Sequence, residues 1–189
     1  IVQSVAANPV VWIVLLIVLL MAVIVGAIGA VIGSGGAANS AEDYTYQAQV
    51  SEQTESYRDM VEDYCEKYGI DDYVDLCLAV IEQESGGNPP DVMQTEQSYY
   101  NVNPPIDTVE ESIDCGTHEL SDCLTKAKSK SPNDIKGISL ALQGYNFGSG
   151  YIDWALKNYG CYSKENAEIF SKKMCVELGY DSYGDVEYV

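Results

Sequence analysis

The pattern of hydrophobic and polar residues divides the chain into two parts. Residues 1–41 contain no charged side chain, whereas charged and apolar residues alternate along the remainder. An unbroken apolar run extends from Val10 to Gly33. At about 1.5 Å per residue this run is roughly 36 Å long as a helix, enough to cross a hydrocarbon core of about 30 Å. The pattern therefore predicts a transmembrane helix at residues 10–33, embedded in a lipid bilayer, after a flank at residues 1–9.

A cleaved signal peptide is the main alternative for this segment, because small residues follow it from Gly35 to Ala41. The apolar run is longer than the about 7–15 residues of a signal-peptide core, which favours an uncleaved anchor. No Lys or Arg precedes the run, so the positive-inside rule assigns no orientation. The small and polar residues 34–54 are expected to form a linker to one folded domain at residues 55–189.

Apolar residues of that domain recur at the three- and four-residue spacing of amphipathic helices. Strand patterns are sparse, so the predicted fold class is mostly α. Residues 86–107 are rich in Asn, Pro, Ser and Tyr and indicate an irregular loop, and a loop of this length in a compact domain is usually functional. Helices are predicted at residues 55–68, 71–85, 107–114, 117–130, 133–145, 149–158 and 164–178.

All the cysteines follow the apolar run. An even set on one side of a membrane is typical of an oxidising exterior, so we expect an extracytoplasmic domain with up to three disulfides, with sequence neighbours as the first choice of partners. Free thiols in a core are the alternative. No Cys-x-x-Cys pair is present and His118 is the only histidine, so neither a metal site nor a cofactor is expected, and His118 is assigned no role. The cysteines are Cys65, Cys77, Cys115, Cys123, Cys161 and Cys175.

The net charge of −19 lies entirely after residue 41. Nucleic acid binding needs a basic surface, so it is excluded as a function. A strongly acidic domain is compatible with work among the polyanions of a bacterial wall, where a basic protein would bind unproductively. Simple solubility is the other explanation of the charge.

Glu84 is the most informative single residue. It follows Val80 by four positions and Ile81 by three, and so lies on the apolar stripe of its predicted helix. The Ser-Gly-Gly-Asn-Pro segment directly after it must end that helix, which places Glu84 at the negative end of the helix dipole. Both surroundings raise the pKa of a carboxyl group. Glu84 is therefore expected to hold its proton as a general acid requires.

Three short segments occur in order from this residue onward. Together they resemble the lysozyme-like superfamily of soluble lytic transglycosylases and goose-type lysozymes. They are most similar to the CwlT-like lysozyme domain of membrane-anchored proteins from Gram-positive conjugative elements, and the resemblance covers residues 57–189. The segments are Glu84-Ser85-Gly86-Gly87-Asn88-Pro89, Asp91-Val92-Met93-Gln94-Thr95-Glu96-Gln97-Ser98 and Ala141-Leu142-Gln143-Gly144-Tyr145-Asn146-Phe147-Gly148-Ser149-Gly150.

The resemblance implies a lysozyme-like fold and cleavage of the β-1,4 bonds between MurNAc and GlcNAc in peptidoglycan, with Glu84 as general acid. It makes the glycan strands the substrate and conjugation or secretion machinery a candidate partner, with the anchor keeping the wall hydrolase local. CwlT-like proteins commonly continue into an NlpC-type cysteine peptidase domain. No segment here resembles the Cys-His motif of that peptidase, so no peptidase activity is expected.

A hydrolase that uses two carboxylates needs the second one about 5–10 Å from the first. Glu96, Asp91 and Glu82 are the candidates, and Glu96 in the loop is the first choice as the second catalytic residue. Glu82 is the weakest, because two residues along a helix it points off another face. A lytic transglycosylase needs no second carboxylate, since the sugar's own 6-hydroxyl closes an anhydro ring. A wall-binding scaffold without activity is the third alternative.

Residues of the three segments also supply candidate contacts to the sugar. Gln94, Tyr145 and Asn146 match positions that line the sugar cleft of the family, and Ser85 and Ser98 lie in the same segments. Each polar side chain there would bind hydroxyl or N-acetyl groups. Tyr145 could equally pack in the core with its hydroxyl satisfied internally, Asn146 could cap its helix, and Ser85 could satisfy the helix end.

Overall fold

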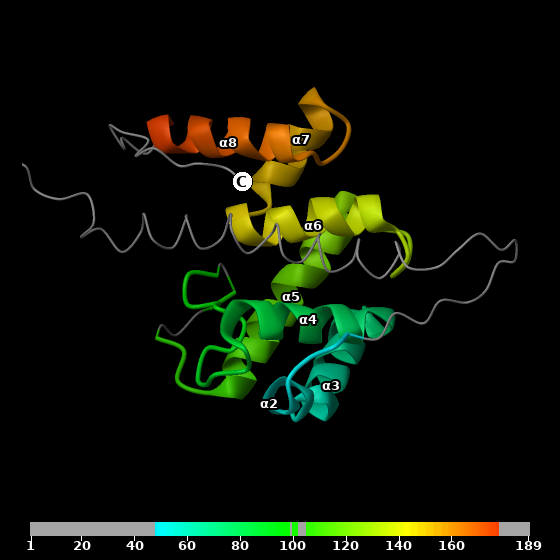
Figure 1. Ribbon diagram of the computed structural model, residues 1–189, viewed down its shortest axis with the longest axis vertical. Coiled ribbons are helices and arrows are strands. Elements are labelled where there is room, and N and C mark those ends of the chain that lie inside the picture. The colour runs from blue at the N-terminus through cyan, green and yellow to red at the C-terminus, as the bar shows by residue number, and fades with distance from the viewer. Residues whose placement is uncertain (1–47, 99, 102–104, 178–189) are drawn as a thin grey trace, which may run out of the picture.

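The computed structural model describes residues 48–98, 100–101 and 105–177, and this part of the chain is helical (Figure 1). None of the described residues forms a strand, which confirms the prediction of a mostly α domain. The elements are α2 (Glu52–Glu55), α3 (Arg58–Tyr68), the 3-10 helix η2 (Asp71–Tyr73), α4 (Val74–Ser85), α5 (Val109–Ala127), α6 (Ile135–Phe147), α7 (Gly150–Asn158) and α8 (Lys164–Glu177).

The predicted transmembrane helix at residues 10–33 lies outside the described residues. Over the ranges that the structure does describe, every helix is too short or too polar to cross a bilayer.

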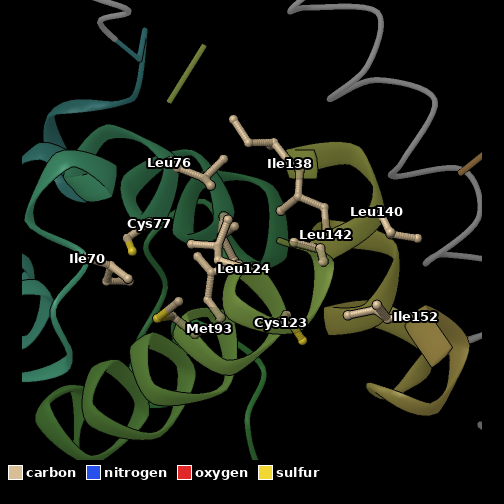
Figure 2. Packing of buried hydrophobic residues seen from close by; sticks show 14 of the residues in the cluster. Ile70, Leu76, Cys77, Met93, Cys123, Leu124, Ile138, Leu140, Leu142 and Ile152 are labelled. Carbon is tan, nitrogen blue, oxygen red and sulfur yellow. The ribbon is translucent and has the colours of Figure 1, made fainter. Parts of the chain in front are cut away.

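Helix α5 runs through the middle of the domain (Figure 1). It packs against α3 on one side and against α6 on the other, and α4 packs on α3. Apolar side chains from all these helices meet in one core around Leu124, Leu142 and Met93, some of which are labelled in Figure 2. Fully buried residues of this core include Val61, Leu78, Ile81, Ile113, Leu120 and Ile152.

The prediction of two helices at residues 107–114 and 117–130 was wrong, because α5 continues without a break through Gly116. Gly116 does not end the helix; it allows close packing of Met93 against α5. A Cβ atom at Gly116 would lie 2.5 Å from the Sδ atom of Met93. The missing side chain therefore leaves room for the loop before α5 to press against the helix. A capping box between Thr108 and Glu111 begins α5.

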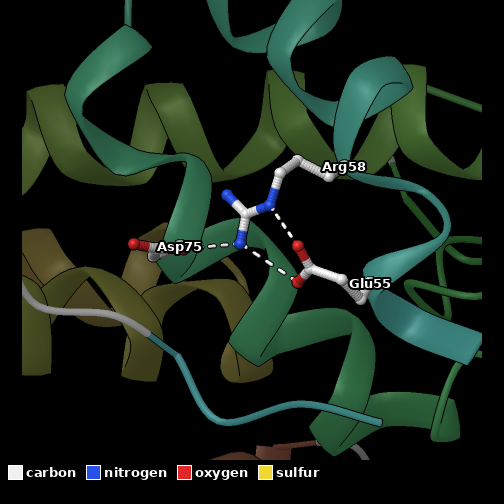
Figure 3. A network of polar contacts seen from close by, with 3 residues as sticks. All are labelled: Glu55, Arg58 and Asp75. Carbon is white, nitrogen blue, oxygen red and sulfur yellow. Dashed lines mark hydrogen bonds and ion pairs between the residues drawn. The ribbon is translucent and has the colours of Figure 1, made fainter. Parts of the chain in front are cut away.

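An ion-pair network fixes the start of the domain (Figure 3). The guanidinium of Arg58 in α3 contacts Glu55 of α2 and, at 3.0 Å from Nη2 to Oδ1, Asp75 in the first turn of α4. Partly exposed pairs of this kind contribute at most about 1 kcal/mol each. The network links α2, α3 and the start of α4.

Candidate active site

Glu84 lies in the last turn of α4, which ends at Ser85 against Gly86 with φ of 62°. The side chain is half-buried. Burial, and secondarily the negative charge of Asp91, raises the pKa of Glu84 to about 7. The expected direction of the shift is confirmed. Its cause includes a neighbour, Asp91, that the helical pattern alone did not identify.

Four hydrogen-bond donors converge on the Asp91 carboxylate. Its Oδ1 accepts from the hydroxyl of Ser112 at 2.7 Å, the hydroxyl of Thr95 at 3.0 Å and the backbone N–H of Thr95 at 2.8 Å. Its Oδ2 accepts from the backbone N–H of Glu96 at 2.9 Å. An ionised carboxylate only accepts hydrogen bonds, so four donors suit a negative charge held in place beside Glu84.

Three helices hold the segment that carries Asp91. From α4 the Ser85 hydroxyl donates to the carbonyl of Val92 at 2.8 Å. From α5 the Ser112 hydroxyl accepts from the N–H of Met93 at 2.9 Å, and from α6 the Tyr145 hydroxyl donates to the Met93 carbonyl at 2.9 Å. The irregular loop is therefore fixed at residues 91–95, directly beside the catalytic candidate.

Among the predicted sugar contacts, Ser85 and Tyr145 are engaged in these internal bonds. The alternative interpretation was that the two hydroxyl groups are satisfied within the protein. The structure provides such an internal partner for each of them. Burial and, secondarily, the negative charge of Glu84 raise the pKa of Tyr145 well above its usual value. Tyr145 joins the loop to α6 through its bond to the Met93 carbonyl.

Gln94 is exposed and has φ of 54°, in the left-handed region. Its side-chain amide donates to the backbone carbonyl of Asp91 at 2.9 Å. A non-glycine residue costs about 1–2 kcal/mol in this conformation, and such residues gather at binding sites. The left-handed backbone conformation of Gln94 is therefore compatible with a role of its side chain in binding.

Asn146 and Ser98 lie on different elements. Asn146 is half-buried in the last turn of α6, and the helix continues through Phe147 to Gly148, so Asn146 is not the cap residue. Ser98 lies in the loop, where its hydroxyl accepts from the N–H of Tyr100 at 3.2 Å. Ser98 also contacts Glu119 of α5. Burial raises the pKa of the Glu119 carboxyl, and the hydrogen bond from Ser98 offsets part of this rise.

The other two carboxylate candidates differ from Asp91. Glu96 is exposed, and among the causes of the raised pKa of Glu84 the charged neighbour is Asp91. Glu82 points to the start of α2. Its Oε2 accepts hydrogen bonds from the backbone N–H of Ser51 at 3.1 Å and from the Ser51 hydroxyl at 2.8 Å. Hydrogen bonds from Thr54 and Ser51 lower the pKa of Glu82. Glu82 thus supports the fold.

Comparisons with known proteins identify the family of the chain. The sequence profile described as Lysozyme-like matches residues 51–189. The chain belongs to the lysozyme-like family. This confirms the predicted membership, including its closeness to CwlT-like domains, and it supports the prediction that the chain is a glycosidase.

Three relatives illustrate the lysozyme-like assignment. The bifunctional muramidase/DL-endopeptidase CwlT of Bacillus subtilis is 36% identical over 140 residues, which cover 74% of this chain and 40% of CwlT. The membrane protein YocA of the same organism is 28% identical, covering 66% of this chain and 53% of YocA. A crystal structure of a protein similar to a lipoprotein of the NLP/P60 family from Staphylococcus aureus has a TM-score of 0.58 and 30% identity, covering 75% of this chain and 51% of that chain.

Two residues that hold the loop of this lysozyme-like domain were missed by sequence reasoning. Ser112 lies inside α5, and no local pattern distinguishes it from other polar residues of that helix. His118 was assigned no role, yet its ring lies between Tyr68, at 4.3 Å between centroids, and Tyr100, at 3.8 Å. The stack connects the loop to α3 and α5. Its members are far apart in sequence, so only the fold could bring them together.

The five cysteines whose side chains the structure describes are free thiols, so the expected disulfides are not seen. One neighbour pair is impossible. Cys115 and Cys123 are eight positions apart on the single helix α5, about 12 Å along its axis, whereas a disulfide needs Cα atoms within about 7 Å. Across the described residues, no group of three or more His, Cys, Asp or Glu side chains is placed to hold a metal ion.

Proposed function

We propose that this chain is a muramidase that cleaves the β-1,4 bonds between MurNAc and GlcNAc in peptidoglycan, with Glu84 as the general acid. The observation that carries the proposal is a half-buried carboxyl with a pKa of about 7, next to a hydrogen-bonded carboxylate, in a lysozyme-like domain. CwlT, a bifunctional muramidase by name, supports the same activity. The chain spans 40% of CwlT, so the activity of the whole protein is part of the proposal.

In the proposed mechanism, Glu84 donates its proton to the glycosidic oxygen as the bond from C1 to that oxygen breaks. Positive charge develops on C1 and the ring oxygen. We assign the stabilisation of this charge to Asp91, because its carboxylate is held by four donors and acts electrostatically on Glu84. Water then adds to C1 and restores the proton of Glu84. Glu96 stays the alternative for the second carboxylate.

The substrate contacts in this proposal are divided between two elements. Gln94 and Ser98 belong to the loop, and Tyr145 and Asn146 belong to the last turn of α6. Amide and hydroxyl groups at these positions would bind the N-acetyl and hydroxyl groups of the sugars. Ser85 would act indirectly, since its hydroxyl holds the loop at Val92.

The direct test is digestion of purified cell walls by the chain, followed by mass spectrometry of the released glycan. A muramidase gives products with a reducing end. A lytic transglycosylase gives 1,6-anhydro products that are lighter by one water. Glu84→Gln should abolish release, whereas Glu62→Gln, at an exposed position of α3, should leave it unchanged. Wall binding without release by the unaltered chain would favour the scaffold alternative and contradict the proposal.

We also propose that residues 10–33 anchor the enzyme in the membrane of a Gram-positive bacterium, with the domain outside the cytoplasm. The apolar run of 10–33 and the name of YocA, a membrane protein, support this arrangement. The anchor would confine wall cleavage to the neighbourhood of a conjugation or secretion machine. Protease added to intact protoplasts should digest the domain, and the remaining fragment should stay in the membrane fraction. Full protection of the domain would contradict the orientation.

A further inference from the structure

Cys65 and Cys77 meet in the core of the domain. Cys65 lies on α3 and Cys77 on α4, and both side chains are fully buried. Their Sγ atoms are 3.6 Å apart, although the two residues are separated by twelve positions in sequence. Within the described part of the chain they are the one pair of cysteines in contact. Figure 2 shows Cys77 among the apolar side chains of this core.

We propose that Cys65 and Cys77 form a disulfide that joins α3 to α4 in the exported protein. The inference rests on the extracytoplasmic location proposed above, because only an oxidising compartment keeps such a bond. The two sulfur atoms must approach from 3.6 Å to the about 2 Å of a disulfide bond. The ion pair from Arg58 to Asp75 already holds the same two helices together.

The bond forms by two successive thiol–disulfide exchanges with a protein disulfide oxidant. The thiolate of one cysteine attacks the oxidant's disulfide, which gives a mixed disulfide and releases one thiol of the oxidant. The second cysteine then attacks the first cysteine's sulfur, and the other oxidant thiol leaves. Two electrons and two protons pass to the oxidant, which ends as a dithiol.

Burial determines when this exchange takes place. The contact with Cys65 and desolvation raise the pKa of the Cys77 thiol well above its usual value, so Cys77 has little reactive thiolate in the folded chain, where both side chains are fully buried. The exchange must therefore occur while the two helices are still docking. Once formed, the bond is covered by the core and protected from external reductants.

The other described cysteines lack such a partner. Cys123 is buried, Cys115 is half-buried with its thiol directed to the backbone carbonyl of Tyr100, and Cys161 is exposed. The proposed disulfide also has a consequence for the site, because Cys77 and Glu84 belong to the same helix, α4. A covalent link at Cys77 holds the helix of the proposed acid against α3.

Mass spectrometry of the full chain, exported by a bacterium and alkylated without reduction, tests the proposal. Digestion after Glu and Lys separates the two cysteines, since Glu66 and Lys67 lie between them. We expect one pair of joined peptides, about 2 Da lighter than their sum, which reduction splits. Recovery of both cysteines as alkylated free thiols would overturn the disulfide. Release of glycan by that same sample would show that the proposed function stands independently.

Thermal unfolding gives a second measurement. Heating opens the core and exposes the bond, so reductant present during unfolding should lower the melting temperature of the unaltered chain by about 10 °C, because it removes the constraint on the unfolded state. The double variant Cys65→Ala, Cys77→Val, which keeps the core volume nearly constant, should lose this response to reductant. Cys161→Ser alters an exposed cysteine and should retain it. An equal response in both variants would place the reducible bond elsewhere.

Discussion

At the scale of single residues, Glu84 combines a chemical advantage with a cost in stability. Burial raises the pKa of the Glu84 carboxyl to about 7, whereas a free glutamate has a pKa near 4.5. Between these values the folded chain binds more protons than the unfolded chain. The contribution of Glu84 to stability is therefore fully present below pH 4.5 and is lost as the pH rises through 7.

Glu84→Gln should consequently stabilise the domain at alkaline pH while it abolishes activity. We expect the free energy of unfolding of the variant to exceed that of the unaltered chain by ~3 kcal/mol at pH 8, and to match it at pH 4. Urea denaturation at the two pH values measures the difference, with Glu62→Gln as control. If the difference in unfolding free energy between the variant and the unaltered chain is the same at pH 4 and pH 8, Glu84 is not desolvated.

Asp91→Asn should alter the pH dependence of the reaction. Removal of the negative charge lowers the pKa of Glu84, so the loss of activity on the alkaline side should move to lower pH by less than about one unit, because burial is the larger cause of the shift. We also expect kcat to fall about 10–100-fold. Initial rates on solubilised glycan between pH 4 and 9 measure both effects.

Glu96→Gln is the matched comparison for Asp91→Asn. Glu96 lies in the same loop and is exposed, so its variant should retain both the rate and the pH profile if Asp91 is the second carboxylate. The opposite outcome, a large loss in Glu96→Gln with little change in Asp91→Asn, would restore Glu96 to that role. Melting temperatures of both variants separate a loss of chemistry from a loss of structure.

At the scale of elements, α5 organises the site although it carries none of the predicted catalytic residues. Ser112 connects it to Asp91 and Met93, Gly116 leaves space for Met93, and His118 stacks with Tyr100. The irregular loop is therefore packed on α5 at three positions within about two turns. A loop held in this way can keep Asp91 at a constant position relative to Glu84.

Ser112→Ala should weaken both stability and catalysis. It removes one donor from Asp91 and leaves the Met93 N–H without its acceptor, which should lower the free energy of unfolding by about 1–3 kcal/mol. We expect kcat to fall more than KM rises, because Asp91 is misplaced rather than lost. Ser121→Ala, another buried serine of α5, is the control and should change stability by less than about 0.5 kcal/mol. Equal effects of the two substitutions would contradict a positioning role for Ser112.

At the scale of the whole molecule, we expect the net charge of −19 to oppose the approach of the proposed enzyme to anionic wall polymers. Repulsion between an acidic domain and anionic wall polymers slows association, and dissolved salt screens it over a Debye length of about 10 Å at 0.1 M. We expect the rate of wall clearing to rise as NaCl increases from about 10 to 150 mM. Release from short, uncharged glycan fragments should change little. A rate on walls that falls with salt would indicate attraction through a local basic surface instead.

Much of the fold could be predicted from the sequence because helices are local. The three- and four-residue spacing and the glycines after Tyr68 and Ser85 located α3 and α4 closely. The same spacing placed Glu84 on a buried face and so predicted the direction of its pKa shift. The predicted break in α5 was wrong because it depended on a contact that is not local. Gly116 gives space to Met93, a residue 23 positions earlier along the chain.

The sequence by itself thus determined a helical, lysozyme-like chain with a candidate acid at a helix end. Only the tertiary structure decided which groups surround that acid. Asp91 is brought to Glu84 by bonds from three helices, and Cys65 meets Cys77 because α3 packs on α4. Such contacts depend on how helices pack rather than on the residues adjacent to each position. For this reason periodicity identified the acid but not its partner.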